Sequence, residues 1–221
     1  MDHFSMARNE ETENAGQERD LVWQEISREH IIQDEWIDFR RSKYRFPDGS
    51  VFEPYYSYSR RDYVVIVASD EEGRFICVRQ FRQGIEEVTT EFPAGGIERA
   101  EKREYRTKDA DDLASGDAAG GEDPLEAAKR ELQEETGYIS DKWTHLLTIP
   151  SNATIADNYA HLYLAEKCRK VSSQNLDETE FLQVLKYSFD EIEGMIHSGS
   201  FQQAVHTLAW MMAKERMEKS S

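Results

Sequence analysis

The sequence predicts an α/β protein with a strand-rich segment ahead of its main domain. Residues 62–69 form a nearly continuous apolar run of strand length, and residues 75–83 are expected to return as its hairpin partner. Residues 123–137 carry apolar side chains at helical spacing. Before them, residues 21–58 alternate aromatic or β-branched residues with charged ones. A chain of 221 residues is long enough for one such domain, or for one and a half.

The composition limits the kinds of molecule that the protein is expected to bind. The formal net charge is −17, and such a surface repels nucleic acid and anionic lipid, so we expect neither as a general partner. The N-terminus lacks a basic-then-apolar signal, and no apolar run approaches about 20 residues. The cysteines, Cys77 and Cys168, show no zinc-ligand spacing. We therefore expect a cytoplasmic protein with reduced thiols and no membrane partner.

The N-terminal region is expected in two parts. Residues 1–20 are polar and acidic without periodicity, which is typical of a disordered tail. Residues 21–58 are expected to form a β meander with a turn at Pro47-Asp48-Gly49. Such a small sheet buries little by itself, so it must pack on the main domain or on another copy of the chain. Its exposed apolar face leads us to expect a homodimer.

The main domain is expected over residues 59–221. It begins with a hairpin of two strands, and a further strand then runs into Pro93-Ala94-Gly95-Gly96. Glycines at this point let the backbone approach a ligand closely and point its carbonyl groups at a cation. Residues 99–121 have almost no apolar content, so we expect them to form a flexible surface insertion.

The helix over residues 123–137 has clear boundaries. Asp123 can cap the free amides, Pro124 fits the first helical position, and Gly137 ends the helix. Glu131 and Glu135 stand four residues apart, so their Cβ atoms should lie within roughly 5–6 Å. Glutamates on a helix more often form a solvated face than a metal site.

A cation would stabilise this group of glutamates. Glu134 lies beside Glu131 and Glu135, and like charges at this spacing repel one another. Arg130 offsets only part of that repulsion. Mg²⁺ would offset the rest, because it prefers carboxylate oxygen as a ligand.

Beyond this helix the pattern predicts strands at residues 142–149, 160–165 and 182–187. Ser188 and Ser200 are expected to be the N-caps of two C-terminal helices. The buried stripe of the second helix is expected to consist of Ala204, Val205, Leu208, Ala209 and Met212.

The stretch from Gly116 to Tyr138 resembles the Nudix box. Its fixed positions are a glycine, five residues, Glu122, seven residues, and then Arg130-Glu131-Leu132-Gln133-Glu134-Glu135-Thr136-Gly137-Tyr138. In the most similar Nudix proteins the phrase leading into the helix is continuous, whereas here its halves stand at residues 93–98 and 121–124. We therefore interpret Gly95 as the structural glycine and the Gly116 match as coincidental. The insertion would then project from the loop before the helix.

The order of elements over residues 21–216 is similar to the ADP-ribose pyrophosphatase branch of the Nudix hydrolases. The resemblance implies an α/β/α sandwich with a mixed sheet, and a homodimer that exchanges its N-terminal β-sheets. It also implies Mg²⁺ as cofactor, with Mn²⁺ able to substitute. The implied metal ligands are Ala94, through its carbonyl, and Glu131, Glu134 and Glu135. Arg130 would orient the glutamates, and Glu122 and Gly137 are structural positions of the motif.

The remaining candidates also follow from the resemblance. The phrase at residues 177–180 matches an acidic phrase of the family, which makes Glu178 the candidate general base and Glu180 a further metal ligand. A solvated acidic turn is the alternative, because acidic side chains are mostly exposed. The candidates for contact with substrate are Arg82, which matches the family's Q-x-R, Glu91, Gly95 and Gly96.

The expected reaction is Mg²⁺-dependent hydrolysis of the pyrophosphate bond of a nucleoside diphosphate sugar. ADP-ribose or another ADP-sugar is the first candidate, and the products would be a nucleoside monophosphate and a sugar phosphate. Many ADP-ribose hydrolases carry S-P-G where this chain has Pro150-Ser151-Asn152-Ala153, which leaves the substrate open. The alternatives are a catalytically silent nucleotide sensor and a hydrolase of GDP-mannose or another nucleotide. The retained box glutamates favour an enzyme.

Overall fold

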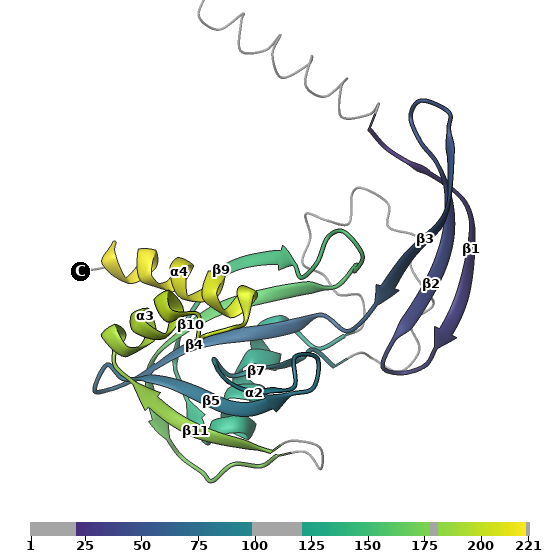
Figure 1. The fold of residues 1–221 in the computed structure, drawn as a ribbon. Coiled ribbons are helices and arrows are strands. Elements are labelled where there is room, and N and C mark those ends of the chain that lie inside the picture. Colours follow the sequence, from purple (N-terminus) through teal and green to yellow (C-terminus); the bar gives the residue numbers. More distant parts are fainter. Residues whose placement is uncertain (1–20, 99–120, 177–180, 220–221) are drawn as a thin grey trace, which may run out of the picture. The chain divides into compact units, whose positions relative to one another are not determined.

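The computed structural model describes residues 21–98, 121–176 and 181–219 (Figure 1). The expected tail and nearly all of the expected insertion lie outside the described residues. The chain divides into two compact units. The N-terminal unit runs to Arg60 and includes residues 152–157, and the main unit comprises the rest of the chain. In the described part, no helix is long and apolar enough to cross a membrane.

The N-terminal unit contains the predicted meander. Its antiparallel strands, in the order β1-β2-β3, are β1 (Gln24–Gln33), β2 (Asp38–Arg45) and β3 (Val51–Ser59). The turn between β2 and β3 requires a left-handed residue, and Gly49 supplies it with φ 85°. Asp48 Oδ1 accepts a hydrogen bond from the Ser50 N–H at 2.9 Å. The prediction of strands joined by this turn is confirmed.

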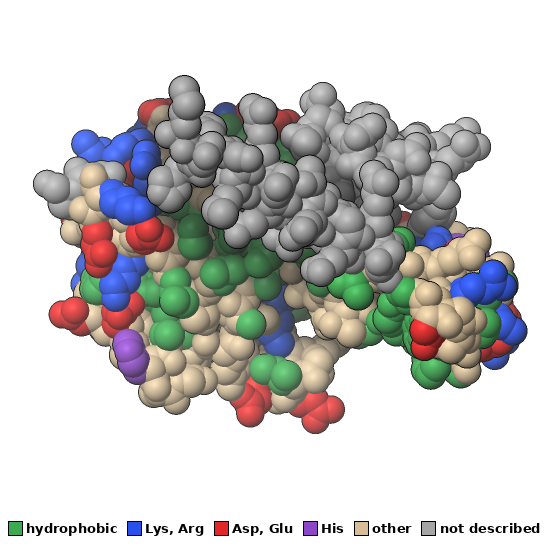
Figure 2. All heavy atoms as spheres, turned by 90° about the horizontal axis from the view of Figure 1, so that it is seen from above, with side chains coloured by type: hydrophobic (Ala, Val, Ile, Leu, Met, Phe, Trp, Pro, Cys, Tyr) green, Lys and Arg blue, Asp and Glu red, His purple; other side chains and the backbone are tan. Residues whose placement is uncertain are grey.

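This sheet exposes apolar side chains and buries polar ones. Every residue of β1 is exposed, and hydrophobic side chains reach the surface beside charged ones (Figure 2). The buried face of β2 instead carries Asp38, Arg40 and Ser42. Asp157, from the segment that belongs to this unit, accepts hydrogen bonds from Arg40 Nη2 at 3.1 Å and Ser59 Oγ at 2.5 Å. The described residues of this unit are therefore held partly by polar contacts, and they contribute nothing to the two apolar core clusters of the protein.

The main unit contains a mixed sheet of eight strands. Its central order is β11-β5-β4-β10-β8, with β6 on β5, β7 on β4 and β9 on β10. Among its described pairs, β4 and β10 run parallel and the others antiparallel. The strands are β4 (Tyr63–Asp70), β5 (Phe75–Arg82), β6 (Glu87–Glu91), β7 (Ala94–Gly96), β8 (Tyr138–Ile139), β9 (Lys142–Pro150), β10 (Tyr159–Lys170) and β11 (Leu182–Tyr187).

Helices cover both faces of this sheet. Successive side chains of a strand point to opposite faces, and β4 shows this with Val64 in one apolar cluster and Val65 in another. The cluster around Val64 includes residues of α2 (Pro124–Thr136), and the cluster around Val65 includes residues of α3 (Phe189–Ser198) and α4 (Ala204–Glu218). The expected arrangement of helices on both faces of a mixed sheet is confirmed (Figure 1).

The C-terminal helices confirm one predicted cap and overturn another. Ser188 caps α3, and its Oγ accepts from the Glu191 N–H at 3.3 Å. The prediction for Ser200 is wrong, because α4 begins only at Ala204 after Gln203. The Ser200 N–H instead donates to the Met195 carbonyl at 2.9 Å, at the end of α3.

The buried stripe of α4 also differs from the prediction. Ala204 is exposed, and only Ala209 of the five predicted residues is fully buried. Val205 and Leu208 are partly buried and pack against the core, and the helix also turns His206, Trp210 and Ala213 toward it. The buried face includes His206, whose polar ring gives no signal in a pattern of apolar residues.

Candidate functional site

Helix α2 begins and ends as predicted. Asp123 Oδ1 accepts from the Leu125 N–H at 2.9 Å, and Pro124 is the first helical residue. Gly137 ends the helix with φ 76°, and its N–H donates to the Gln133 carbonyl at 2.8 Å. A Cβ on Gly137 would lie 2.2 Å from the Ser172 carbonyl oxygen. Glycine is therefore required here both by the left-handed backbone and by the close neighbour.

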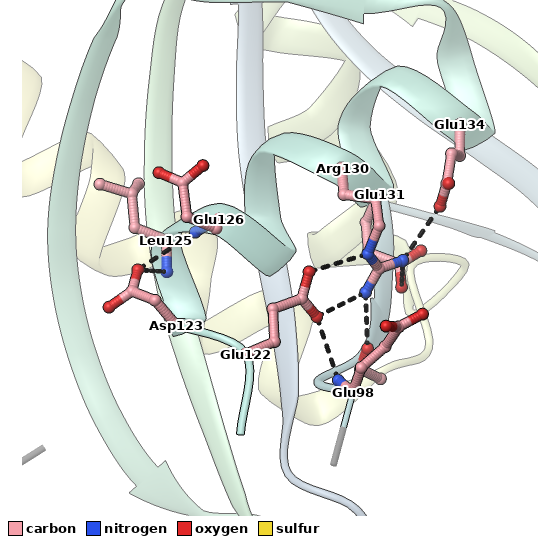
Figure 3. Close-up of polar contacts among 9 residues, drawn as sticks. Glu98, Glu122, Asp123, Leu125, Glu126, Arg130, Glu131 and Glu134 are labelled. Carbon is pink, nitrogen blue, oxygen red and sulfur yellow. Dashed lines mark hydrogen bonds and ion pairs between the residues drawn. The ribbon is translucent and has the colours of Figure 1, made fainter. Parts of the chain in front are cut away.

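Arg130 connects the glutamates of the helix to the glycine loop (Figure 3). Its Nε and Nη2 each donate to Glu122 at 2.9 Å, forming a bidentate pair. Its Nη1 donates to Glu131 at 2.8 Å and to Glu134 at 3.0 Å, and Nη2 also donates to the Gly96 carbonyl at 3.0 Å. The hydrogen bonds with Glu122 are the main cause that raises the pKa of Arg130, and they lower the pKa of Glu122. Arg130 thus orients these groups and offsets part of their repulsion.

The glycine loop lies directly against the same helix. The first half of β4 pairs with β7 rather than with β5, which places Ala94 and Gly95 beside the sheet centre. A Cβ on Gly95 would lie 2.0 Å from Glu131 Cδ. The Ala94 N–H donates to Glu135 Oε2 at 3.0 Å. A Cβ at this position would force the Glu131 carboxylate to move, which supports our interpretation of Gly95. Gly116 lies outside the described residues.

The two ends of the expected insertion are bonded to each other. The Glu122 N–H donates to the Glu98 carbonyl at 3.0 Å. In return, the Glu98 N–H donates to Glu122 Oε2 at 3.0 Å (Figure 3). The chain therefore leaves and re-enters the main unit at neighbouring points. The two halves of the family phrase lie together in space although 22 residues separate them in the sequence, which agrees with an insertion that projects from this loop.

Arg82 and Glu91 form a second ion pair. Arg82 Nε and Nη2 donate to the two carboxylate oxygens of Glu91 at 2.8 and 2.5 Å. Glu91 is 0% exposed, whereas the Arg82 side chain is 37% exposed. Burial, the largest effect, raises the pKa of Glu91, but the hydrogen bonds from Arg82 and Thr89 and the positive charge of Arg82 act in the opposite direction, and the net pKa is lowered. Glu91 is therefore a buried carboxylate that holds a partly exposed guanidinium.

The acidic candidates Glu178 and Glu180 lie outside the described residues. The segment before them is bound to the C-terminal turn of α2. Gln174 Nε2 donates to the Glu135 carbonyl at 2.8 Å, and the Asn175 N–H donates to the Glu134 carbonyl at 2.9 Å. Sequence reasoning missed these two contacts, because a polar loop carries no signal for which carbonyls it will bond.

The donor set fits a hard divalent cation. Glu131 and Glu135 are 7% and 2% exposed and both contact the glycine loop. Across residues 21–98, 121–176 and 181–219 there is no group of three or more metal-ligating His, Cys, Asp or Glu residues. Mg²⁺ in phosphate chemistry needs only one or two carboxylates, with the remaining positions filled by water and substrate phosphate. Two buried carboxylates meet this requirement.

Comparisons with known proteins agree with this geometry. A model of the NUDIX domain matches residues 59–205. The chain is 27% identical over 202 residues to an ADP-ribose pyrophosphatase from Bacillus subtilis (strain 168), covering 87% of this chain and 94% of that protein. It is 31% identical over 129 residues to a methanol dehydrogenase activator from Bacillus methanolicus, covering 58% of each. A solved structure of an ADP compounds hydrolase shares the fold, with a TM-score of 0.70 and 18% identity over 91% of this chain and 97% of that one.

Proposed function

The chain belongs to the Nudix family and is a pyrophosphohydrolase of that family, and from this premise we propose that it cleaves the pyrophosphate bond of a nucleoside diphosphate sugar. ADP-ribose or another ADP-sugar is the first candidate, because a relative covering 87% of the chain is an ADP-ribose pyrophosphatase. The observation that carries the proposal is the pair of buried carboxylates, Glu131 and Glu135, placed against the glycine loop. A cation bound between the helix and the loop would compensate the cost of burying these two negative charges.

The proposed ligands of that cation are Glu131, Glu135 and the Ala94 carbonyl, with Glu134 nearby and Mn²⁺ able to replace Mg²⁺. When bound, Mg²⁺ neutralises diphosphate charge and lowers the pKa of a bound water. The protein's own contribution is to fix the ligands. Arg130 holds Glu131 and Glu134 from one side. The Ala94 N–H holds Glu135 from the other.

Arg82 is the proposed contact to the diphosphate. Its bidentate pair with Glu91 fixes the plane of the guanidinium, and the exposed part of the side chain is available to phosphate oxygens. Because Glu91 is fully buried, we assign it to orienting Arg82 rather than to touching the substrate. Of the two loop glycines, Gly95 gives room to Glu131 and Gly96 gives its carbonyl to Arg130.

Glu178 remains the proposed general base and Glu180 a further metal ligand. Support comes from the described residues just before them. Asn175, three positions ahead of Glu178, is bonded to the backbone of Glu134 on the glutamate helix. A base in this part of the chain could take the proton from the attacking water if it reaches hydrogen-bond distance.

We further propose a homodimer in which the N-terminal sheets are exchanged. The support is the apolar surface of the N-terminal unit, which is large for a sheet of three strands. Its exposed apolar residues include Leu21, Val22, Trp23, Ile26, Ile31, Ile32, Trp36, Val51 and Phe52.

The test of the reaction is a hydrolysis panel with and without Mg²⁺. ADP-ribose, ADP-glucose, GDP-mannose, UDP-glucose and NADH are assayed for release of nucleoside monophosphate. We expect an ADP-sugar to be the best substrate. Glu135→Gln should lower kcat about 1000-fold, a size seen when a single charge-stabilising group is removed from an active site. Glu126→Gln, at an exposed residue in the first turn of the same helix, is the matched control and should keep full activity.

Two results would overturn the proposal. One is an absence of turnover for every diphosphate in the panel, which would favour a nucleotide sensor. The other is full activity in Glu135→Gln. Preference for GDP-mannose or UDP-glucose would keep the reaction and refute the adenine nucleotide as substrate.

A further inference from the structure

The carboxylate of Glu91 is held from the C-terminal helix as well as from the sheet. Gln203, the residue that precedes the first turn of α4, donates through Nε2 to Glu91 Oε1 at 3.3 Å. Thr89 Oγ1 donates to the same oxygen, and Arg82 binds both oxygens. A buried carboxylate is stable only with such a full set of donors. The orientation of Arg82 therefore depends partly on α4, which is more than a hundred residues away in sequence.

His206 lies one turn further along the same helix and holds the next residue of the loop. It is 4% exposed, and its Nδ1 accepts a hydrogen bond from the Phe92 N–H at 3.2 Å. An imidazole nitrogen that accepts a hydrogen bond carries no proton. Burial is the main cause that lowers the pKa of His206 to about 4, which keeps the ring neutral near pH 7. The ring thus serves as a fixed acceptor inside the core.

The next two residues of the backbone, Pro93 and Ala94, are also held by hydrogen bonds. The Pro93 carbonyl accepts from the Ile66 N–H at 2.9 Å, and the Ala94 N–H donates to Glu135 at 3.0 Å. His206 therefore anchors one end of a three-residue span, Phe92 to Ala94, and Glu135 anchors the other. A shift at Phe92 would be carried to the Ala94 carbonyl, because the intervening peptide units are planar and Pro93 has a fixed φ.

We propose that His206 of α4 and Gln203, just before α4, are positioning residues of the pyrophosphate site. His206 sets the backbone that presents the Ala94 carbonyl, and Gln203 sets Glu91 and, through it, Arg82. This inference rests on the proposed hydrolase function. Neither residue touches the substrate in this scheme. Each acts through the group that it holds.

Three substitutions at His206 separate positioning from mere packing. His206→Asn keeps a side-chain oxygen near the place of Nδ1, His206→Gln moves the polar group outward, and His206→Leu removes the acceptor. We expect His206→Asn to keep kcat within about 3-fold of the wild type. His206→Gln and His206→Leu should lower kcat by about 10- to 100-fold, since a misplacement of about 1 Å at a reacting site has an effect of this size.

Two control variants account for lost stability and for changes elsewhere on the helix. Ile192→Ala opens a cavity in the same apolar core, and the aliphatic side chain of Ile192 cannot hydrogen bond to the loop. Met211→Ala changes an exposed residue of α4. If Ile192→Ala loses as much kcat as His206→Leu at equal loss of stability, the positioning role is overturned. Met211→Ala should behave as the wild type, and a loss equal to that of His206→Leu would equally contradict the proposal.

Hydrogen exchange in the metal-free protein tests the anchor without reference to activity. The Phe92 amide should exchange at least about 10-fold faster in His206→Leu than in the wild type, and His206→Asn should restore protection. Unchanged protection in His206→Leu would overturn the anchor. If the wild type hydrolyses no diphosphate, the proposed function fails, and the exchange result then decides on the anchor by itself.

Discussion

The N-terminal unit and the main unit place their side chains in opposite ways. All ten residues of β1 are exposed, whereas seven of the eight residues of β4 are buried. In the main unit two apolar clusters fill both faces of the sheet, while the buried positions of β2 are Asp38, Arg40 and Ser42. The main unit therefore completes its own core and contains the described part of the site. The N-terminal unit exposes many large apolar side chains, which is consistent with the proposed association with a second copy of the chain.

Matched core and surface substitutions test this contrast and should give the largest effect. Leu162→Ala, in a fully buried position of β10, should lower the free energy of unfolding by about 3 kcal/mol, because it leaves a cavity. Ile31→Ala, in an exposed position of β1, should change it by less than about 0.5 kcal/mol in the monomer. Urea unfolding measures both.

The concentration of protein decides what the Ile31 result means. If the apolar face is covered in a homodimer, Ile31→Ala should raise the monomer fraction in sedimentation experiments, and its effect on stability should grow with protein concentration. The homodimer would be refuted if the wild type sediments as a monomer at every concentration and Ile31→Ala sediments in the same way. A negligible loss in Leu162→Ala would break the contrast between the units.

The second effect concerns pH, and it belongs to the main unit. Burial lowers the pKa of His206 from its ordinary 6.5 to about 4. Between these values the unfolded chain binds a proton that the folded chain does not. His206 therefore contributes its full stability above about pH 6.5, and loses about 3 kcal/mol of it as pH falls toward 4.

Replacing His206 should remove this dependence of folding stability on pH. In His206→Asn the urea midpoint should vary less between about pH 7 and pH 4 than in the wild type. An acid limb as steep in His206→Asn as in the wild type would contradict this assignment.

The third effect tests the assignment of the chemistry to the main unit. Arg130→Lys keeps the charge but loses the planar fork that reaches Glu122, Glu131 and Glu134 together. We expect kcat to fall about 10- to 100-fold, or about 2 kcal/mol at 1.36 kcal/mol for each factor of ten. Arg41→Lys, in an exposed ion pair of the N-terminal unit, is the control and should keep activity. Equal losses in both variants would contradict the assignment.

The smallest effect on stability is expected from the insertion. Removing residues 100–119 shortens a loop whose ends, Glu98 and Glu122, are already hydrogen bonded. The free energy of unfolding should change by less than about 1 kcal/mol, because loop entropy varies slowly with length. Turnover or the choice of substrate in the hydrolysis panel should change. A chain that no longer folds, as judged by circular dichroism, would show that the main unit needs this segment and that the interpretation of Gly95 is wrong.

The strands and the glutamate helix were predictable because their signals are local. Continuous apolar runs, the Asp123-Pro124 start and the Gly137 stop act within a few residues, and packing did not override them. The predicted start of α4 is wrong because a local capping signal was overridden by a contact with the preceding helix. A serine was available at position 200, but the chain used it to close α3, and Gln203 precedes α4 without a side-chain cap.

The sequence by itself determined the order of the strands and helices, the box with Glu131 and Glu135, and the class of chemistry these imply. Only the tertiary structure showed that Gly95 leaves room for Glu131, that Glu91 is buried behind Arg82, and that His206 from the last helix bonds to Phe92. These contacts join residues 9 to 114 positions apart. Periodicity and capping report neighbours within a few residues, so contacts at such separations appear only once the sheet has brought the segments together.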